Sequence, residues 1–72
     1  MKFHESDTVK VTKDINNKIK KDMVGVVVYV EEGYSIYEVE FLDSKGYTID
    51  LQTISEENLE LIKEYASNEE NK

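Results

Sequence analysis

The sequence predicts an all-β domain in which five short strands curl into a small barrel. Three observations lead to this fold class: apolar and polar residues alternate along most of the chain, helical spacing is almost absent, and polar or Gly-containing turns separate the alternating runs. A chain of 72 residues has room for one domain, which we expect to span residues 1–65. A chain of this size buries only about 60% of the surface that its unfolded form exposes, so its core is thin.

A first strand is predicted to lead into a long loop. In residues 7–12, two valines fall on one face and polar side chains on the other, as in a half-buried strand. Residues 13–22 are polar and contain an Asn-Asn pair, which indicates a loop. We expect Ile15 and Ile19 to fold back from this loop and anchor it on the core.

The next two strands form a predicted hairpin. Residues 23–31 are rich in β-branched side chains, which favour strands, and residues 35–42 resume the alternation after a turn at Glu32-Gly33. The alternation predicts that the following side chains point into the core: Val24, Val26, Val28, Val30, Tyr37, Val39 and Phe41.

A second turn is predicted at residues 43–46, where Gly46 can adopt a positive φ. The strand that follows, residues 47–51, alternates again. It places Tyr47, Ile49 and Leu51 on one face and completes a three-stranded meander.

The C-terminal part is predicted as a turn and a last strand. Residues 55–58 read as a single 3-10 turn begun by a capping Ser, and residues 59–62 as a short fifth strand that allows the sheet to close. A single helix over residues 55–66 is the alternative, because apolar residues there also fall at helical spacing. Residues 66–72 have no apolar period and are predicted to form a disordered acidic tail.

The same alternation predicts an apolar surface with an acidic rim on the outside of the hairpin. Apolar side chains that point away from the core gather there with Tyr and Glu, a composition typical of a protein-binding site. The predicted partner-binding residues are Val27, Tyr29, Glu31, Tyr34, Ile36, Glu38, Glu40 and Leu42. The alternative is that the first loop or the C-terminal segment covers these side chains.

The charge of the chain indicates the kind of partner. The net charge is -7 and no Arg is present. Residues 1–30 carry six lysines and four acids, whereas residues 31–72 carry three lysines and twelve acids. Such a field steers basic proteins toward the molecule and opposes nucleic acid, which requires Lys and Arg to replace its counterions. We therefore predict a basic protein as the partner, with a homodimer through the same surface as an alternative. A further alternative is that the surplus acid merely keeps a small cytosolic protein soluble.

One combination of motifs resembles a known family. The glycine-led strand Val24-Gly25-Val26-Val27-Val28-Tyr29-Val30 is followed about ten residues later by Tyr37-Glu38-Val39-Glu40-Phe41, with Asp43 and Gly46 beyond it. Over residues 7–62 this pattern resembles an uncharacterised bacterial family of small SH3-like domains of unknown function. The resemblance implies a five-stranded SH3-like barrel without catalytic residues. The lysine-bearing first loop departs from the family pattern, in which a Gly is common just before the valine strand.

The same strand is more loosely similar to the KOW motif of transcription and ribosome-associated factors, in which a Gly sits early in a strand between apolar residues. Only Gly25 and its valine neighbours match that motif. This likeness implies a nucleic-acid-binding or ribosome-associated module as an alternative function. The lysines that would serve it are Lys10, Lys13, Lys18, Lys20 and Lys21. Because Asp14 and Asp22 dilute this cluster, nucleic acid is the less favoured partner.

The sequence contains no recognisable catalytic or metal-binding constellation. Its one histidine, His4, lies near Glu5 and Asp7, but a metal site usually needs three or four converging ligands. Without Cys, and with no sequence resembling a nucleophile elbow around any Ser, nucleophilic catalysis has no evident residues. We therefore expect no enzyme activity, no cofactor and no metal.

Together these features predict a non-enzymatic protein-binding module, and its most specific form is an immunity-type inhibitor of a basic toxin. A homo-oligomeric adaptor is a further alternative. No apolar run approaches the roughly 18 residues that a membrane span requires, and a chain without Cys suits a reducing compartment. We expect a cytoplasmic protein that does not contact membranes.

Overall fold

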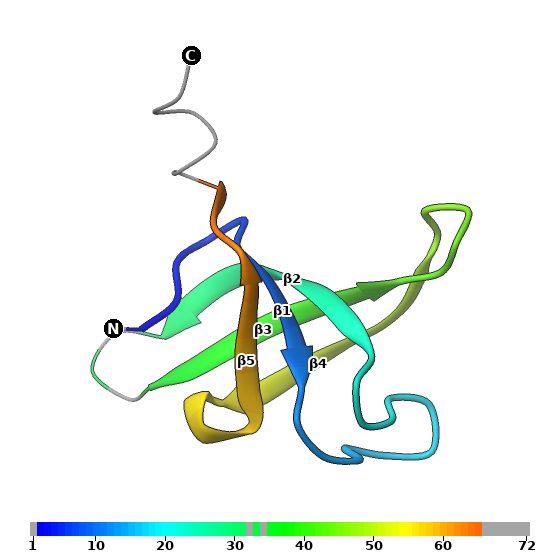
Figure 1. Ribbon diagram of the computed structural model, residues 1–72, viewed down its shortest axis with the longest axis horizontal. Helices are drawn as coiled ribbons and strands as arrows, with labels where there is room; N and C mark the ends of the chain where they lie inside the picture. The colour runs from blue at the N-terminus through cyan, green and yellow to red at the C-terminus, as the bar shows by residue number, and fades with distance from the viewer. Residues whose placement is uncertain (1, 32, 34, 66–72) are drawn as a thin grey trace.

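The computed structural model describes residues 2–31, 33 and 35–65, which form one antiparallel sheet of five strands. The strands are β1 (Thr8–Val11), β2 (Val24–Glu31), β3 (Ile36–Leu42), β4 (Thr48–Ser55) and β5 (Leu59–Lys63), and the 3-10 turn η1 (Glu56–Asn58) joins the last two. The order across the sheet is β4-β3-β2-β1-β5, and the strands can be followed in Figure 1.

This architecture confirms the all-β prediction. The turn-plus-strand interpretation of the C-terminal part is also confirmed, since η1 and β5 occupy the segment where a helix was the alternative. No strand pairing joins β4 to β5 within residues 2–31, 33 and 35–65. Closure of the sheet into a barrel therefore stays a prediction, and the predicted disordered tail, residues 66–72, lies outside the described residues.

The inner face of β2 carries Gly25 and Val27 rather than the valines that the alternation indicated. Val27 is 1% exposed, whereas Val24 and Val28 are 47% and 41% exposed. The prediction that Val24, Val26 and Val28 point into the core is therefore wrong. The physical reason is the glycine: a Cβ atom on Gly25 would lie 2.8 Å from a backbone carbonyl oxygen of β3. Only a residue without a Cβ atom fits this inner position. Because Gly25 occupies it, Val27 also faces the core, and Val24 and Val26 face the other side of the sheet.

A β-bulge in the middle of β2 then restores the predicted phase. Val27 pairs with Val39, but Tyr29, two residues further along β2, pairs with Glu38, which is only one residue further along β3. Two residues of β2 therefore stand opposite one residue of β3, which bends the strand and increases its twist. Beyond the bulge, Val30 packs against the core as predicted.

The predicted inner face of β3 is confirmed, but the predicted common face of Tyr47, Ile49 and Leu51 in the next strand is not. Tyr37, Val39 and Phe41 are each 0% exposed. In β4 the expected common face of residues 47–51 is broken, because Tyr47 and Leu51 are exposed while the isoleucine between them packs against the core. A register shift at the C-terminal end of β3 causes this difference.

Two residues from outside the strands complete the core. Phe3 is fully buried, and its ring meets Tyr37 edge to face at a centroid distance of 5.2 Å. Ile19 is fully buried in the first loop, and Ile15 is half-buried, which confirms the predicted anchors. The complete buried cluster is Phe3, Val9, Val11, Ile19, Val27, Tyr37, Val39, Phe41, Ile54 and Leu59.

Side-chain hydrogen bonds shape the two main loops. In the first loop, Oδ1 of Asn16 accepts hydrogen bonds from the backbone N–H groups of Lys18 and Ile19, both at 2.8 Å. In the turn between β3 and β4, Oδ1 of Asp43 accepts a bond from the N–H of Lys45 at 2.8 Å, and Gly46 has a φ of 89°. The predicted glycine turn is thereby confirmed.

Within the part of the chain that the structure describes, no helix has the length and apolar character that a membrane crossing needs.

Candidate protein-binding surface

The sheet has an outer face, opposite the core, that runs across β2, β3 and β4. Directly paired residues of an antiparallel sheet share a face. Glu40 pairs with Val26 of β2 on one side and with Leu51 of β4 on the other, and Glu38 pairs in the same way with Tyr29. The apolar and acidic residues of this outer face are Val26, Tyr29, Glu31, Ile36, Glu38, Glu40, Leu42 and Leu51.

The outer face exposes large apolar side chains. Tyr29, Leu42 and Leu51 are 51%, 41% and 54% exposed, and they come from three neighbouring strands. Val28, in the bulge of β2, adds a fourth exposed apolar side chain. Neither the first loop nor the C-terminal strand buries these residues, so the alternative in which they are covered is not what the described residues show.

Two glutamates of the outer face are held in place by threonines of β4. Oγ1 of Thr53 donates a hydrogen bond of 2.7 Å to Oε2 of Glu38, and Oγ1 of Thr48 donates one of 2.6 Å to Oε2 of Glu40. Both glutamates are half-buried. Among the described residues, neither carboxylate has a Lys or His within ion-pair distance. The outer face therefore presents ordered negative charge that no cation of the described residues neutralises by an ion pair.

Most of the predicted partner-binding residues lie on this face, but one of them is buried in the core. Tyr29, Glu31, Ile36, Glu38, Glu40 and Leu42 lie on it. Val27 does not, because the inner position of Gly25 also turns Val27 into the core. Tyr34 lies outside the described residues.

Sequence reasoning missed Leu51, which lies on the outer face. The alternation from Tyr47 to Leu51 placed it with Ile49, whereas the register shift between β3 and β4 puts Leu51 opposite Glu40. The signal that could have located it is the pattern of β4 beyond residue 51. Ile54 is the one deeply buried apolar residue of that strand, at 2% exposure, and counting back from it in steps of two does not reach Leu51.

Two of the lysines that would serve the KOW-like alternative, Lys10 and Lys18, lie near acidic residues of the same chain. The Nζ atom of Lys10 lies 3.6 Å from Oδ1 of Asp22. Asp50 of β4 has a lowered pKa, because it accepts a hydrogen bond from the Gln52 amide and, to a smaller extent, because Asn16 and Lys18 of the first loop lie nearby. These contacts reduce the positive charge that the first loop offers to a nucleic acid.

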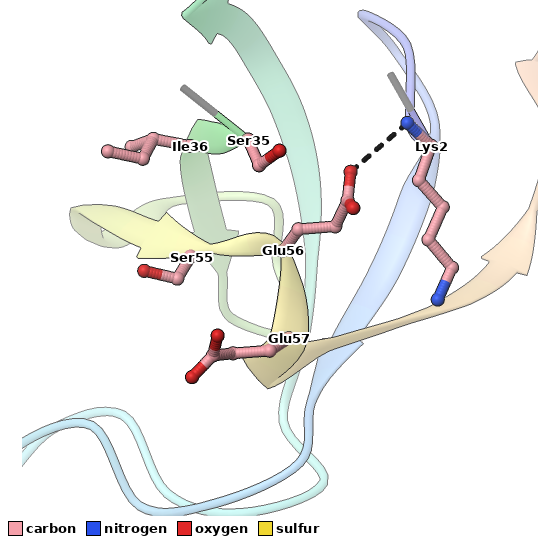
Figure 2. Close-up of a pocket in the computed structure, with 6 residues that line it drawn as sticks. All are labelled: Lys2, Ser35, Ile36, Ser55, Glu56 and Glu57. Atoms are coloured by element: carbon pink, nitrogen blue, oxygen red, sulfur yellow. Dashed lines mark hydrogen bonds between the residues drawn. The ribbon is translucent and has the colours of Figure 1, made fainter. Parts of the chain in front are cut away.

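A second polar cluster ties the N-terminal segment to the sheet. The hydroxyl of Tyr37 donates a hydrogen bond of 2.6 Å to Oε2 of Glu56 and accepts bonds from the backbone N–H groups of Lys2 and Phe3, at 3.1 and 3.2 Å. The backbone N–H of Lys2 also donates a hydrogen bond of 3.1 Å to Oε2 of Glu56. Figure 2 marks this bond with a dashed line. These contacts hold Phe3 in the core.

The surface beside this cluster is a shallow depression of about 370 Å³. It is lined by Lys2, Ser35, Ile36, Ser55, Glu56 and Glu57. In Figure 2 the Glu56 carboxylate points toward the backbone nitrogen of Lys2, and the Glu57 carboxylate points away from it. With a single apolar side chain in its lining, the depression lacks the apolar walls that are typical of small-molecule sites.

The hydrogen bonds of this cluster shift two pKa values in opposite directions. Burial, and then the bond to Glu56, raises the pKa of Tyr37 above its ordinary value of 10.0. The bond from Tyr37, and then that from the Lys2 backbone, lowers the pKa of Glu56 below its ordinary value of 4.5. The ionised Glu56 and the neutral Tyr37 are therefore the forms that the fold favours.

Acid is expected to weaken the attachment of the N-terminal segment. Because the pKa of Glu56 is lower in the folded state, its contribution to stability is present above pH 4.5 and is lost as the pH falls through the folded-state pKa. We expect the stability difference between the wild type and Glu56→Gln to shrink as the pH falls from neutrality to below 4.5. Urea unfolding over this range measures it. A difference that stays constant with pH would show that the charge of Glu56 plays no part.

Near His4, the carboxylate of Asp7 connects two distant parts of the backbone. Asp7 is buried, and its two carboxylate oxygens accept hydrogen bonds from the backbone N–H groups of His4 at 2.9 Å and Tyr65 at 3.2 Å. Asp7 thereby links the N-terminal segment to the end of β5. Within the described residues no group of three or more His, Asp or Glu side chains is arranged to hold a metal ion.

Comparison with known proteins identifies a family. No curated protein and no solved structure matches the chain. A family model described as a domain of unknown function, DUF4926, matches residues 5–61, which include β1 to β4, η1 and the first three residues of β5. The match covers most of the chain and includes every residue of the outer face. The chain belongs to the family of domains of unknown function DUF4926.

Proposed function

We propose that this chain is a non-enzymatic module that binds a basic protein through the outer face of β2, β3 and β4. The observation that supports it most directly is the state of Glu38 and Glu40: both side chains are half-buried, both accept a hydrogen bond from a threonine, and neither has a cation within ion-pair distance among the residues that the structure describes. Exposed Tyr29 and Leu51 flank them. An apolar centre with ordered charge is the composition of a protein interface.

The charge distribution supports the same partner. The net charge of -7 attracts basic proteins over a distance, and the acids are concentrated in residues 31–72, which contain β3 and β4. An immunity-type inhibitor that covers a basic toxin is the most specific form of this proposal, because a small acidic protein without catalytic groups suffices for it. The lack of Cys supports a reducing compartment such as the cytoplasm.

We also propose that the sheet closes as an SH3-like barrel. The strand order β4-β3-β2-β1-β5, with a 3-10 turn between β4 and β5, supports this topology. Register shifts within the β1–β5, β2–β3 and β3–β4 pairs support it as well, because β-bulges bend strands and allow a short sheet to curl. In such a barrel the outer face of β2–β4 is a convex surface that a partner can reach.

Charge reversal on the outer face is expected to abolish partner binding. A tagged wild-type domain and the Glu38→Lys/Glu40→Lys variant would serve as baits in lysate of the organism that encodes the chain. Glu57→Lys/Glu60→Lys, which makes the same change of charge on η1 and β5, is the matched control. We expect a basic protein, identified by mass spectrometry, to be retained by the wild type and the control and to be lost from the first variant.

Two other outcomes would contradict this proposal. Ribosomal proteins or RNA that are retained equally by all three baits and released by nuclease would favour the KOW-like alternative. A protein that is retained equally by all three baits and resists nuclease would place the binding surface elsewhere on the molecule.

A further inference from the structure

Glu38 and Glu40 present free carboxylate oxygens side by side on β3. Thr53 and Thr48 occupy the Oε2 atom of each, and no described residue donates a hydrogen bond to either Oε1 atom. Residues two apart along a strand are about 7 Å apart, so one cationic group can lie between the two carboxylates. Because the threonines already fix both side chains, binding a cation there costs little further side-chain entropy.

The side chains on either side of this pair differ in chemistry. Tyr29, the direct partner of Glu38 on β2, offers an aromatic ring and is 51% exposed. Leu51, the direct partner of Glu40 on β4, offers an aliphatic surface and is 54% exposed. Since β2 and β4 are separated by two strand spacings, about 10 Å, one long side chain laid across β3 can contact both.

We propose that this group, the Tyr29–Glu38–Glu40 cradle, receives an arginine side chain of the partner. The inference rests on the proposed function and specifies its chemistry. The aliphatic part of the arginine lies over Leu51, and its guanidinium group donates hydrogen bonds to the free Oε1 atoms while stacking on the ring of Tyr29.

The geometry favours arginine over lysine for two reasons. A guanidinium group is planar and stacks on an aromatic ring, whereas an ammonium group is a compact and strongly hydrated point charge. A guanidinium group also carries five N–H donors in a rigid fork and can serve two carboxylates at once, while it keeps its charge at every pH that the protein tolerates.

The test is an NMR titration of the full chain with three peptides of one design. Acetyl-Gly-Arg-Gly-amide is the probe, the lysine peptide tests the choice of cation, and the citrulline peptide keeps the shape of arginine without its charge. We expect saturable shifts of the Tyr29 ring and of the Glu38 and Glu40 amides with the arginine peptide. The affinity should be about tenfold lower for the citrulline peptide, which corresponds to about 1.4 kcal/mol.

Two double variants test whether the arginine peptide binds at Glu38 and Glu40. Glu38→Gln/Glu40→Gln is expected to lose the arginine-specific shifts, and Glu57→Gln/Glu60→Gln is expected to keep them. The inference would be overturned if arginine and citrulline peptides bound equally, if the lysine peptide bound as well as the arginine peptide, or if the first variant kept the shifts. Capture of a basic protein through the outer face without arginine-specific shifts would refute the cradle and leave the proposed function standing.

Discussion

Replacing Phe41 with alanine is expected to lower the free energy of unfolding by about 3 to 5 kcal/mol. The side chain is 0% exposed on the inner face of β3, opposite Gly25, so its removal leaves a cavity that the neighbouring strands cannot readily fill. A domain of this size has a total stability of roughly 4 to 11 kcal/mol, so the substitution removes a large part of it.

Urea unfolding followed by circular dichroism measures this loss, and Val28→Ala is the matched control. Val28 is 41% exposed in the bulge of β2 and should cost less than about 0.5 kcal/mol, as surface substitutions do. The interior described above would be wrong if the two variants unfolded at similar urea concentrations.

Gly25→Ala is expected to destabilise the domain although alanine normally improves a strand. A glycine inside a strand costs about 0.5 to 1 kcal/mol relative to alanine, so the change should stabilise the protein wherever space exists. At Gly25 a Cβ atom would lie 2.8 Å from the carbonyl oxygen of Glu40, 2.8 Å from Cγ1 of Val39 and 2.9 Å from Cδ1 of Phe41. Because the carbonyl belongs to the paired backbone, β2 and β3 must move apart, and overpacking of this kind costs about 1 to 3 kcal/mol.

This prediction is stringent because the substitution should lower stability where alanine would otherwise raise it. Thermal unfolding of Gly25→Ala should show a lower midpoint than the wild type, with Val24→Ala, an exposed neighbour in the same strand, as the control. An unchanged or raised midpoint would mean that Gly25 does not face the interior. The assignment of Val27 to the core would then fail as well.

The number and order of the elements were predictable because local patterns determine them. The alternation at Tyr37, Val39 and Phe41 and the glycine turn at Gly46 are signals within one strand or one turn, and the structure confirms them. The inner face of β2 was not predictable in this way. Four valines at alternate positions give the stronger local signal, and the decisive factor is the space opposite Gly25, which belongs to another strand.

The bulge in β2 also limits how much of the proposed binding surface could be predicted from the sequence. Tyr29 and Val27 were predicted on the same outer face, and uninterrupted alternation would keep them together. The register shift between them separates the two: Val27 shares the inner face with Gly25, and Tyr29 stands opposite Glu38 on the outer face. A β-bulge depends on the register between two strands, so the sequence of one strand alone does not predict it.

The burial of Phe3 shows the same limit at the N-terminus. A segment with one aromatic residue among polar ones carries no periodic signal, and sequence alone gave no reason to place it in the core. Its position depends on Tyr37, whose hydroxyl accepts hydrogen bonds from the backbone of residues 2 and 3 across 34 residues of sequence or more.

The most direct test of the proposed binding surface is site-specific photo-crosslinking from the outer face. The photoreactive residue p-benzoylphenylalanine would replace Leu51, and in a control Ile62, which is similarly exposed at 50% but lies on β5. After irradiation in the organism that encodes the chain, we expect a basic protein to be joined to position 51 and not to position 62. Equal crosslinking from both positions, or crosslinks only to a second copy of this chain, would contradict the binding of a basic partner by the outer face.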